Sequence, residues 1–230
     1  MARRARIVSP GDPHLVVQRT PLGRLAFFDD VDRQAFVDAL AASADPDIAL
    51  HAYALEEDGF QLVATPAGSE GLRRCLQRVG RRYVALFNRR HGLSGGLWQG
   101  RFRAAPLEAD PYLLLAIRAV EQAPVRSGLV TQATDWPWSS AAAHIGRRSS
   151  AFLRDHEALW KLGNTPFERE ARYQDALAIP VPEPDLDILD RAVQAGWPLG
   201  AETYLARIAH STGQPAKPAA RGRPPGVPKA

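Results

Sequence analysis

The sequence predicts an α+β fold of the ferredoxin-like type, followed by a helical C-terminal extension and a disordered basic tail. Three observations lead to this prediction. Short β-rich runs and amphipathic runs follow one another in the order β-α-β-β-α-β-α, which is that of a ferredoxin-like antiparallel sheet with one extra helix. The hydrophobic fraction of 45% and the charged fraction of 23% are those of an ordinary globular protein. From residue 213 onward the chain is rich in Pro, Ala and Gly, a composition that rarely supports a packed core.

The first elements are a strand, a helix and a hairpin. Residues 14–19 are β-rich and predict the first strand. A helix follows residues 27–30, because the next apolar side chains have helical spacing: Phe36, Val37, Leu40 and Ala41. Residues 48–55 and 60–64 predict two further strands, and the turn sequence Glu56-Glu57-Asp58-Gly59 joins them as a hairpin.

The following elements are a long helix, a fourth strand and a second helix. The long helix covers residues 71–90 and ends before two glycine signals, at Gly92 and at Gly95-Gly96. Residues 101–108 predict the fourth strand. The next helix covers residues 111–122, with Asp110 as its N-cap and Pro111 in its first turn. Beyond residue 151 the chain has helical and irregular character.

Composition excludes several classes of protein. No apolar run approaches the roughly 20 residues that cross a bilayer, so we expect no membrane partner. The basic start of the chain has no apolar run behind it, so a secretory signal is not expected. Cys75 is the single cysteine, which excludes an internal disulfide and a cysteine-built zinc site. A reducing, cytoplasmic location is the expectation.

Positive charge is concentrated in one segment. Nine arginines and no acidic residue lie between Glu70 and Glu108, whereas the rest of the chain carries 20 basic and 25 acidic residues. On a helical wheel of residues 71–90, the apolar side chains Leu72, Leu76, Val79, Tyr83 and Phe87 form one stripe. Arg74, Arg78, Arg81, Arg82 and Arg89 form the opposite stripe, so we expect a row of guanidinium groups in solvent. A row without carboxylates is typical of a surface that binds nucleic acid phosphates.

Five sequence blocks carry a resemblance to a known family. In order they are Leu50-His51-Ala52-Tyr53, Phe87-Asn88-Arg89-Arg90-His91-Gly92, Leu97-Trp98-Gln99-Gly100-Arg101-Phe102, Pro124-Val125-Arg126-Ser127-Gly128-Leu129-Val130 and Trp136-Pro137-Trp138-Ser139-Ser140. Together they resemble the REP-associated tyrosine transposases, relatives of the small insertion-sequence transposases that use one tyrosine and an HUH metal motif. The resemblance implies a ferredoxin-like fold that binds single-stranded or hairpin DNA. It predicts a transposase-like (HUH-fold) DNA-binding domain over residues 1–145, a helical extension over 146–212 and a disordered basic tail over 213–230.

This chain lacks the metal-binding and nucleophilic side chains that the resemblance would imply. The resemblance implies a His-hydrophobic-His pair on a strand, which binds Mg²⁺ or Mn²⁺, a tyrosine nucleophile on a later helix and a polar ligand one turn further. The corresponding residues of this chain are Gly59, Gln61, Ala119 and Ala123. We therefore expect no intact catalytic residue, no metal ligand set and no cofactor. The function expected is DNA binding by a catalytically inactive relative of these transposases.

Other assignments stay open at this stage. An active transposase or nickase with substituted ligands is one alternative, and a protein-interaction module without DNA is another. Glu56, Glu57 and Asp58 are either Mg²⁺ ligands or, as we favour, solvated turn residues, and Glu121 is a further carboxylate near the family's active-site position. Trp136 and Trp138 either stack on bases or, as we favour, form a rigid corner.

The expected DNA contacts extend into the tail. Arg221-Gly222-Arg223-Pro224 matches the core of an AT-hook, which lies in a narrow A·T-rich minor groove, although a simple solubility tail is equally compatible. The expected DNA-binding residues are therefore Arg74, Arg78, Arg81, Arg82, Arg89, Arg101, Arg103, Arg221 and Arg223. The partner expected is DNA, bound by a monomer or a homodimer.

Overall fold

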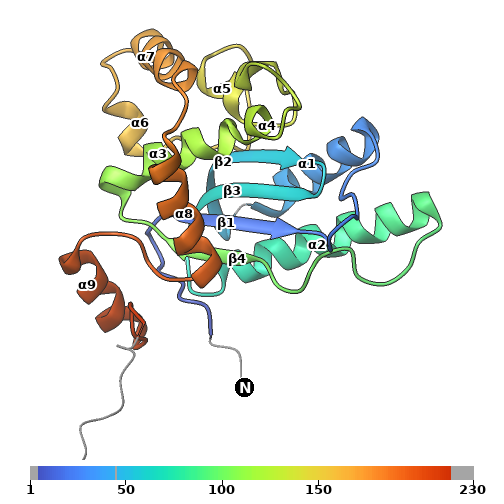
Figure 1. Cartoon of the computed structure of the whole chain (residues 1–230), viewed down its shortest axis with the longest axis horizontal. Coiled ribbons are helices and arrows are strands. Elements are labelled where there is room, and N and C mark those ends of the chain that lie inside the picture. Colours follow the sequence, from blue (N-terminus) through green and yellow to red (C-terminus); the bar gives the residue numbers. More distant parts are fainter. Residues whose placement is uncertain (1–4, 45, 219–230) are drawn as a thin grey trace, which may run out of the picture.

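A four-stranded antiparallel sheet forms the centre of the protein, which is described by a computed structural model over residues 5–44 and 46–218 (Figure 1). The strands are β1 (His14–Arg19), β2 (Ile48–Glu56), β3 (Gly59–Pro66) and β4 (Arg103–Pro106). They are arranged in the order β2-β3-β1-β4, and every neighbouring pair is antiparallel. This is the ferredoxin-like arrangement, so the fold class expected from the sequence is confirmed.

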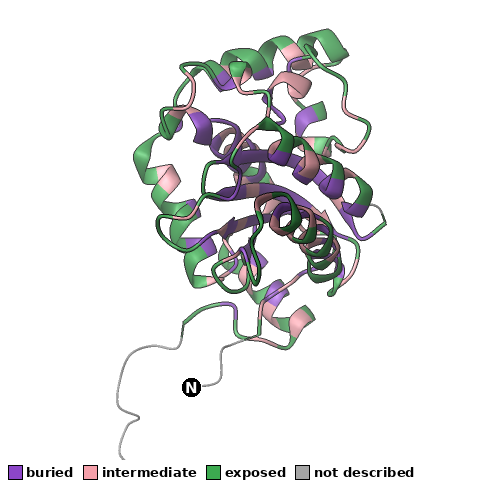
Figure 2. Ribbon diagram, turned by 90° about the vertical axis from the view of Figure 1, so that its right-hand side faces the viewer, coloured by how far each residue is buried: buried purple, intermediate pink, exposed green. Residues whose placement is uncertain are grey.

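Two helices cover one face of the sheet. They are α1 (Asp30–Ala44) and α2 (Gly71–His91), and their apolar side chains pack with alternate residues of β3, Phe60, Leu62 and Ala64. The apolar stripe of α2 is buried as its periodicity predicts, and the helix ends at Gly92, whose φ of 65° is left-handed. Figure 2 shows the strands as mostly buried between helices with exposed outer faces.

The opposite face carries α3 (Ala109–Glu121) and most of the C-terminal helices. These are α4 (Ala123–Arg126), α5 (Ala141–His144), α6 (Glu157–Trp160), α7 (Pro166–Ala178) and α8 (Glu183–Ala195). Tyr173 of α7 and Leu189 of α8 belong to the same hydrophobic cluster as Leu15 of β1 and Val63 of β3. The C-terminal extension therefore shares the core of the sheet.

Several element boundaries differ from the sequence prediction: β3 is longer than residues 60–64, and β4 ends at Pro106 and not at residue 108. β4 begins at Arg103 and not at residue 101, because the carbonyl of Phe102 accepts two hydrogen bonds from the Arg6 guanidinium, of 2.9 and 3.0 Å. Asp110 has an extended backbone (φ −111°, ψ 107°), so the regular part of α3 starts after it, near the predicted position.

Both outer strands of the sheet pair with later parts of the chain. Along β2, Leu55 N donates to Trp138 O at 2.9 Å, Ser140 N donates to Tyr53 O at 2.9 Å and Arg154 N donates to Leu50 O at 2.8 Å. Beside β4, Leu199 N donates to Pro106 O at 2.9 Å, and Glu108 N donates to Leu199 O at 2.8 Å.

The end of the described chain is packed on the N-terminal segment. Ala216 is buried with Ile7 and with Tyr204 and Ile208 of α9 (Glu202–Thr212), and Lys217 forms an ion pair with Glu202. Of the tail that the sequence predicts as disordered from residue 213, the first six residues are described, and among them Ala216 is buried while most are exposed. Arg221 and Arg223 lie outside the described residues.

Candidate nucleic-acid interface

The exposed side of α2 carries arginines that are available to a ligand. Arg81, Arg82 and Arg89 are exposed, and so is Arg101, which precedes β4. Within residues 5–44 and 46–218, their guanidinium groups form no ion pair and no hydrogen bond. Four of the predicted DNA-binding residues are therefore positively charged and exposed, and no Asp or Glu among the described residues forms an ion pair with them.

The beginning of α2 does not follow the prediction. Arg74 Nη2 lies 2.8 Å from Asp47 Oδ1, and Arg78 Nη1 lies 2.5 Å from Asp47 Oδ2. The Asp47 side chain is only 7% exposed, and Arg78 also donates to Ser43 O at 2.6 Å. Burial opposes ionisation of Asp47, but the hydrogen bonds and charges of the two arginines outweigh it and lower the pKa of this carboxyl. The expectation that this face lacks carboxylates is wrong at this end, because Asp47 reaches it from the loop before β2.

Further arginines of the same segment also have partners. Arg90 pairs with Asp29 and Asp32 at 2.6 Å, and its hydrogen bond lowers the pKa of Asp29. Arg73 pairs with Glu70. Arg103, a predicted DNA contact, donates to Gln194 O at the end of α8 at 2.8 Å. Four of the nine arginines of this segment are therefore paired with carboxylates, and Arg81, Arg82, Arg89 and Arg101 have no partner among the described residues.

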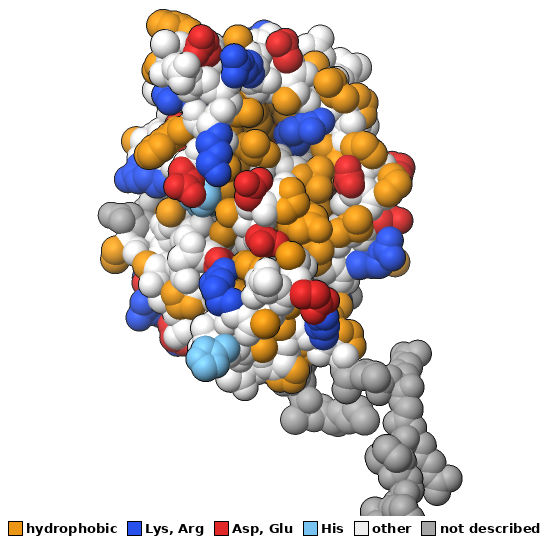
Figure 3. All heavy atoms as spheres, turned by 90° about the vertical axis from the view of Figure 1, so that its left-hand side faces the viewer, with side chains coloured by type: hydrophobic (Ala, Val, Ile, Leu, Met, Phe, Trp, Pro, Cys, Tyr) orange, Lys and Arg blue, Asp and Glu red, His pale blue; other side chains and the backbone are white. Residues whose placement is uncertain are grey.

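A different mixture of charges covers the side where α6, α7 and α9 lie. Figure 3 views the molecule from that side, the left of Figure 1, and shows acidic and basic side chains interspersed among apolar ones. Because this surface carries charges of both signs, it attracts phosphate groups less strongly than the exposed arginines of α2 do.

The positions that correspond to the family's metal site and nucleophile are brought together on the other face of the sheet. Gln61 of β3 and Ala119 of α3 line one cavity of about 330 Å³, and Leu186, Leu189 and Asp190 of α8 line it from outside. The sequence did not predict that α8 would cover this place. The sequence of α8 does not indicate where this helix packs, because its place depends on contacts with β1 and β4.

Two polar residues that line this cavity, Arg19 and Gln61, donate hydrogen bonds to the carboxylate of Glu56, which lies beside it. Glu56 Oε1 accepts hydrogen bonds from Arg19 Nη2 at 2.8 Å and from Gln61 Nε2 at 2.7 Å, and Glu56 Oε2 accepts from Ser127 at 3.0 Å. Arg19 also pairs with Asp58 at 2.8 Å. Glu56 is 7% exposed, so it is not the solvated turn residue that the sequence suggested.

The residues present do not fit a divalent metal ion. Gly59 supplies no ligand, the Gln61 amide donates to Glu56, and the Arg19 cation lies against the carboxylate that would otherwise be available. Ala123, at the start of α4, is buried and has only a methyl group. Among the described residues, no cluster of three or more His, Cys, Asp or Glu side chains is placed to hold a metal.

Gly59 adds a steric restriction. A Cβ at this position would lie 2.1 Å from the backbone oxygen of Gln18 in β1, a distance at which a carbon atom cannot stay. The strands β1 and β3 therefore approach each other too closely for any side chain at residue 59. A histidine there needs a different backbone.

Glu121 forms a buried network that the sequence only partly indicated. Its carboxylate is fully buried and accepts hydrogen bonds from Ser140 Oγ at 2.5 Å, His144 Nδ1 at 2.6 Å and Tyr173 OH at 2.6 Å. Burial alone would lower the pKa of His144, but the charge and hydrogen bond of Glu121 outweigh it and raise that pKa. Burial, followed by the charge of Glu121, raises the pKa of Tyr173 well above its usual value. Three segments that are distant in sequence are joined here, which gives Glu121 a structural role.

The Trp-Pro-Trp segment is a corner fixed to the sheet. Trp136 Nε1 donates to Leu55 O at 2.8 Å, and Trp138 Nε1 donates to Asp30 Oδ1 at 3.0 Å. Both indole N–H groups are thus used within the protein, in agreement with the structural role that we favoured for this segment.

Over the described residues, the chain contains no helix with the length and apolar character to cross a bilayer.

Comparison with known proteins supports the fold. No protein-family model matches the chain, and no curated protein is matched. Among solved structures, the chain is similar to a REP-associated tyrosine transposase bound to a REP hairpin. The two chains share 15% sequence identity and a TM-score of 0.51, and the match covers 68% of this chain and 99% of the transposase. At this identity the likeness shows a shared transposase-like fold, the same α+β architecture that the sequence predicted.

Proposed function

We propose that this protein is a relative of the REP-associated tyrosine transposases that binds single-stranded or hairpin DNA without cutting it. The observation that carries the proposal is the set of exposed, uncompensated arginines on and beside α2: Arg81, Arg82, Arg89 and Arg101. They lie on a fold similar to that of a transposase whose structure contains a REP hairpin. Guanidinium groups without internal partners are suited to phosphate contacts.

The proposal of catalytic inactivity rests on the cavity at Gln61 and Ala119. Phosphoryl transfer requires stabilisation of developing negative charge and a positioned nucleophile. Ala119 has no nucleophilic atom, and Arg19, Gln61 and Ser127 all donate hydrogen bonds to the Glu56 carboxylate. The absence of a metal cofactor is part of the same proposal, since the side chains at this place suit no divalent ion.

The salt dependence of DNA binding tests the first part. If four arginines contact phosphates, log K for a single-stranded oligonucleotide falls against log salt concentration with a slope of about −3, at about −0.7 per contact. The double variant Arg81→Gln with Arg82→Gln should reduce this slope by about 1.4. The matched control removes the same charge from the C-terminal helices, as Arg169→Gln with Arg191→Gln, and should leave the slope unchanged.

The outcomes separate the rival functions. Binding of a hairpin oligonucleotide with the expected slope supports the DNA-binding proposal. Equal slopes for the two double variants would place DNA elsewhere on the protein. A protein that binds no oligonucleotide at low salt would instead be an interaction module. Covalent capture of DNA on a tyrosine in the presence of Mg²⁺ or Mn²⁺ would favour the active alternative with substituted ligands.

A further inference from the structure

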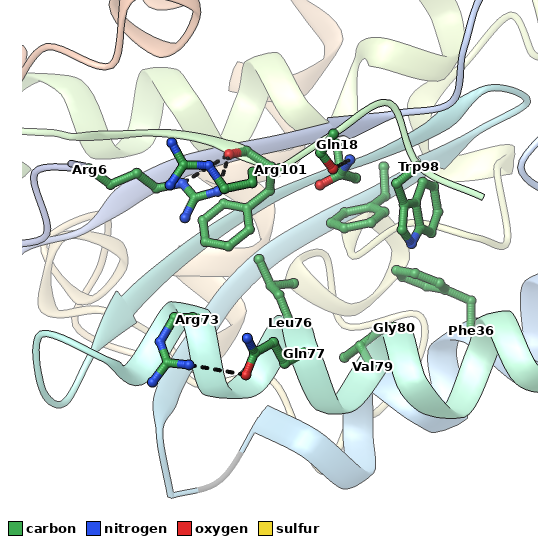
Figure 4. Close-up of a pocket in the computed structure, with 13 residues that line it drawn as sticks. Arg6, Gln18, Phe36, Arg73, Leu76, Gln77, Val79, Gly80, Trp98 and Arg101 are labelled. Carbon is green, nitrogen blue, oxygen red and sulfur yellow. Dashed lines mark hydrogen bonds between the residues drawn. The ribbon is translucent and has the colours of Figure 1, made fainter. Parts of the chain in front are cut away.

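A small pocket lies between α2 and the segment that precedes β4 (Figure 4). Its volume is about 260 Å³, below the roughly 300–1,000 Å³ of sites for drug-sized ligands, so it suits a group no larger than one or two rings. The pocket exists because β4 begins late: residues 100–102 run beside the sheet as a wall and do not continue the strand.

The two ends of the pocket differ in chemistry. Trp98 and Phe36 lie at one end, and Arg6, Arg73 and Arg101 lie toward the other, as Figure 4 shows. The ring of Trp98 is half-buried and belongs to an aromatic cluster, 5.4 Å from the ring of Phe60, which fixes its position. The Arg101 guanidinium is exposed. A flat ring and a phosphate, held a short distance apart, match this arrangement.

A polar side chain reaches the interior of the pocket. Gln18 of β1 is 7% exposed, and its amide makes a long hydrogen bond of 3.4 Å to Gly100 O. A glutamine amide has both donors and an acceptor, which are the groups that a base edge uses.

Gly80 keeps the mouth of the pocket open. It lies in the middle of α2, where glycine is about 1 kcal/mol less favourable than alanine. A Cβ at Gly80 would meet no atom within 4 Å, so no packing reason requires glycine here. Because Gly80 and Leu76 are four residues apart on the helix and both line the pocket, a long side chain at residue 80 would enter it.

We propose that this pocket binds one unpaired nucleotide of single-stranded DNA, with its base against Trp98 and its phosphate toward Arg101. This inference rests on the proposed DNA-binding function and specifies where a base is held. Arg81 lies one helical turn from Gln77, which lines the pocket, so the two side chains are neighbours on α2. A strand with a phosphate at Arg81 can place its next base in the pocket.

Two oligonucleotides with the same phosphates test the proposal. One is an eight-nucleotide thymidine oligomer, and the other has the same length but carries abasic tetrahydrofuran units. One stacked base is worth about 1–3 kcal/mol, so the full-length protein should bind the thymidine oligomer about 5- to 150-fold more tightly. Gly80→Leu should reduce binding of the thymidine oligomer to the level of the abasic one. Gly80→Ala, which leaves the pocket open, should keep the wild-type ratio.

Further measurements make the result decisive. Gly80→Leu should melt at or above the wild-type temperature, because leucine is the better helix former. Gly80→Met, with an unbranched side chain, gives a second occluding variant. Arg101→Gln should weaken binding of both oligomers by the same factor. An unchanged ratio in both occluding variants, or equal wild-type binding of the two oligomers, would overturn the pocket assignment and leave DNA binding intact. If the wild-type protein binds neither oligomer, the proposed DNA-binding function itself is overturned.

Discussion

Substitution of Gly59 by alanine should destabilise the protein, although Gly→Ala in ordinary backbone normally stabilises. The φ angle of Gly59 is not positive, so alanine could adopt this backbone and would gain about 0.4–1 kcal/mol through the unfolded state. The added Cβ would lie 2.1 Å from Gln18 O, about 0.9 Å inside the 3.0 Å limit of real contacts. Because the opposing atom belongs to the backbone, strand β1 itself has to move.

The size of the effect follows from this displacement. Forced overpacking in a closed interior costs about 1–3 kcal/mol, which in a chain of this size lowers the melting temperature by about 2–12 °C. Gly80→Ala is the matched control, because its Cβ meets open space. It should raise the melting temperature by about 2–4 °C through helix propensity.

Thermal unfolding followed by circular dichroism measures both variants. Opposite signs of the two shifts support the close approach of β1 and β3. A Gly59→Ala protein that melts at or above the wild-type temperature would refute the reasoning, and with it the argument that a histidine cannot be accommodated at residue 59.

Four further predictions concern charge, chemistry and the tail. Arg78→Gln should lower the free energy of unfolding by about 1.5–3 kcal/mol, because Asp47 loses a hydrogen bond of the kind made to charged groups. Arg82→Gln should change the free energy of unfolding by less than about 0.5 kcal/mol. Denaturant titration of both variants compares these values. Purified protein with Mg²⁺ or Mn²⁺ should form no denaturation-resistant adduct with single-stranded DNA, and Ala119→Tyr alone should not restore one; any such band on a denaturing gel contradicts this. The pKa of His144 is raised in the folded protein, so its pairing with Glu121 stabilises the fold fully below pH 6.5, the ordinary histidine pKa. This stabilisation is lost as the pH rises through the higher pKa of the folded state. The difference in unfolding free energy between wild type and His144→Gln should therefore shrink with increasing pH. Deletion of residues 219–230 spares Ala216, which is buried, and Lys217, which forms an ion pair. If Arg221 and Arg223 act as an AT-hook, the deletion should weaken binding to A·T-rich duplex more than to G·C-rich duplex. Equal losses of affinity for the two duplexes would exclude the AT-hook.

Local periodicity was sufficient to predict the four strands and the first three helices, but not the individual C-terminal helices or the pairing of charges. The apolar stripe of α2 follows from residues three and four positions apart, so the sequence of that segment determines it. Asp47, which neutralises Arg74 and Arg78, is 27 and 31 residues away and comes from another element. A segment without acidic residues can therefore lie in a neutral environment, and only the three-dimensional structure separates Arg82 from Arg78.

The candidate chemical site shows the same division. Comparison of sequence blocks placed Gln61 and Ala119 together, and the structure brings them to one cavity. The Glu56 network and the cover formed by α8 depend on contacts between distant segments, which no spacing rule reveals. Glu121 stood out as an unexplained carboxylate, but its partners His144 and Tyr173 are 23 and 52 residues further along the chain.

The pairing of both outer strands has a consequence for assembly. A free sheet edge offers a row of backbone donors and acceptors onto which another chain can add a strand. Here Trp138, Ser140 and Arg154 bind along β2, and Leu199 binds at the end of β4, so segments of the same molecule already use these groups. A homodimer of this protein would therefore not form by continuation of the sheet from β2, because that edge is already occupied along its length. The same intramolecular cover protects the β2 edge against the strand-to-strand growth that leads to aggregation.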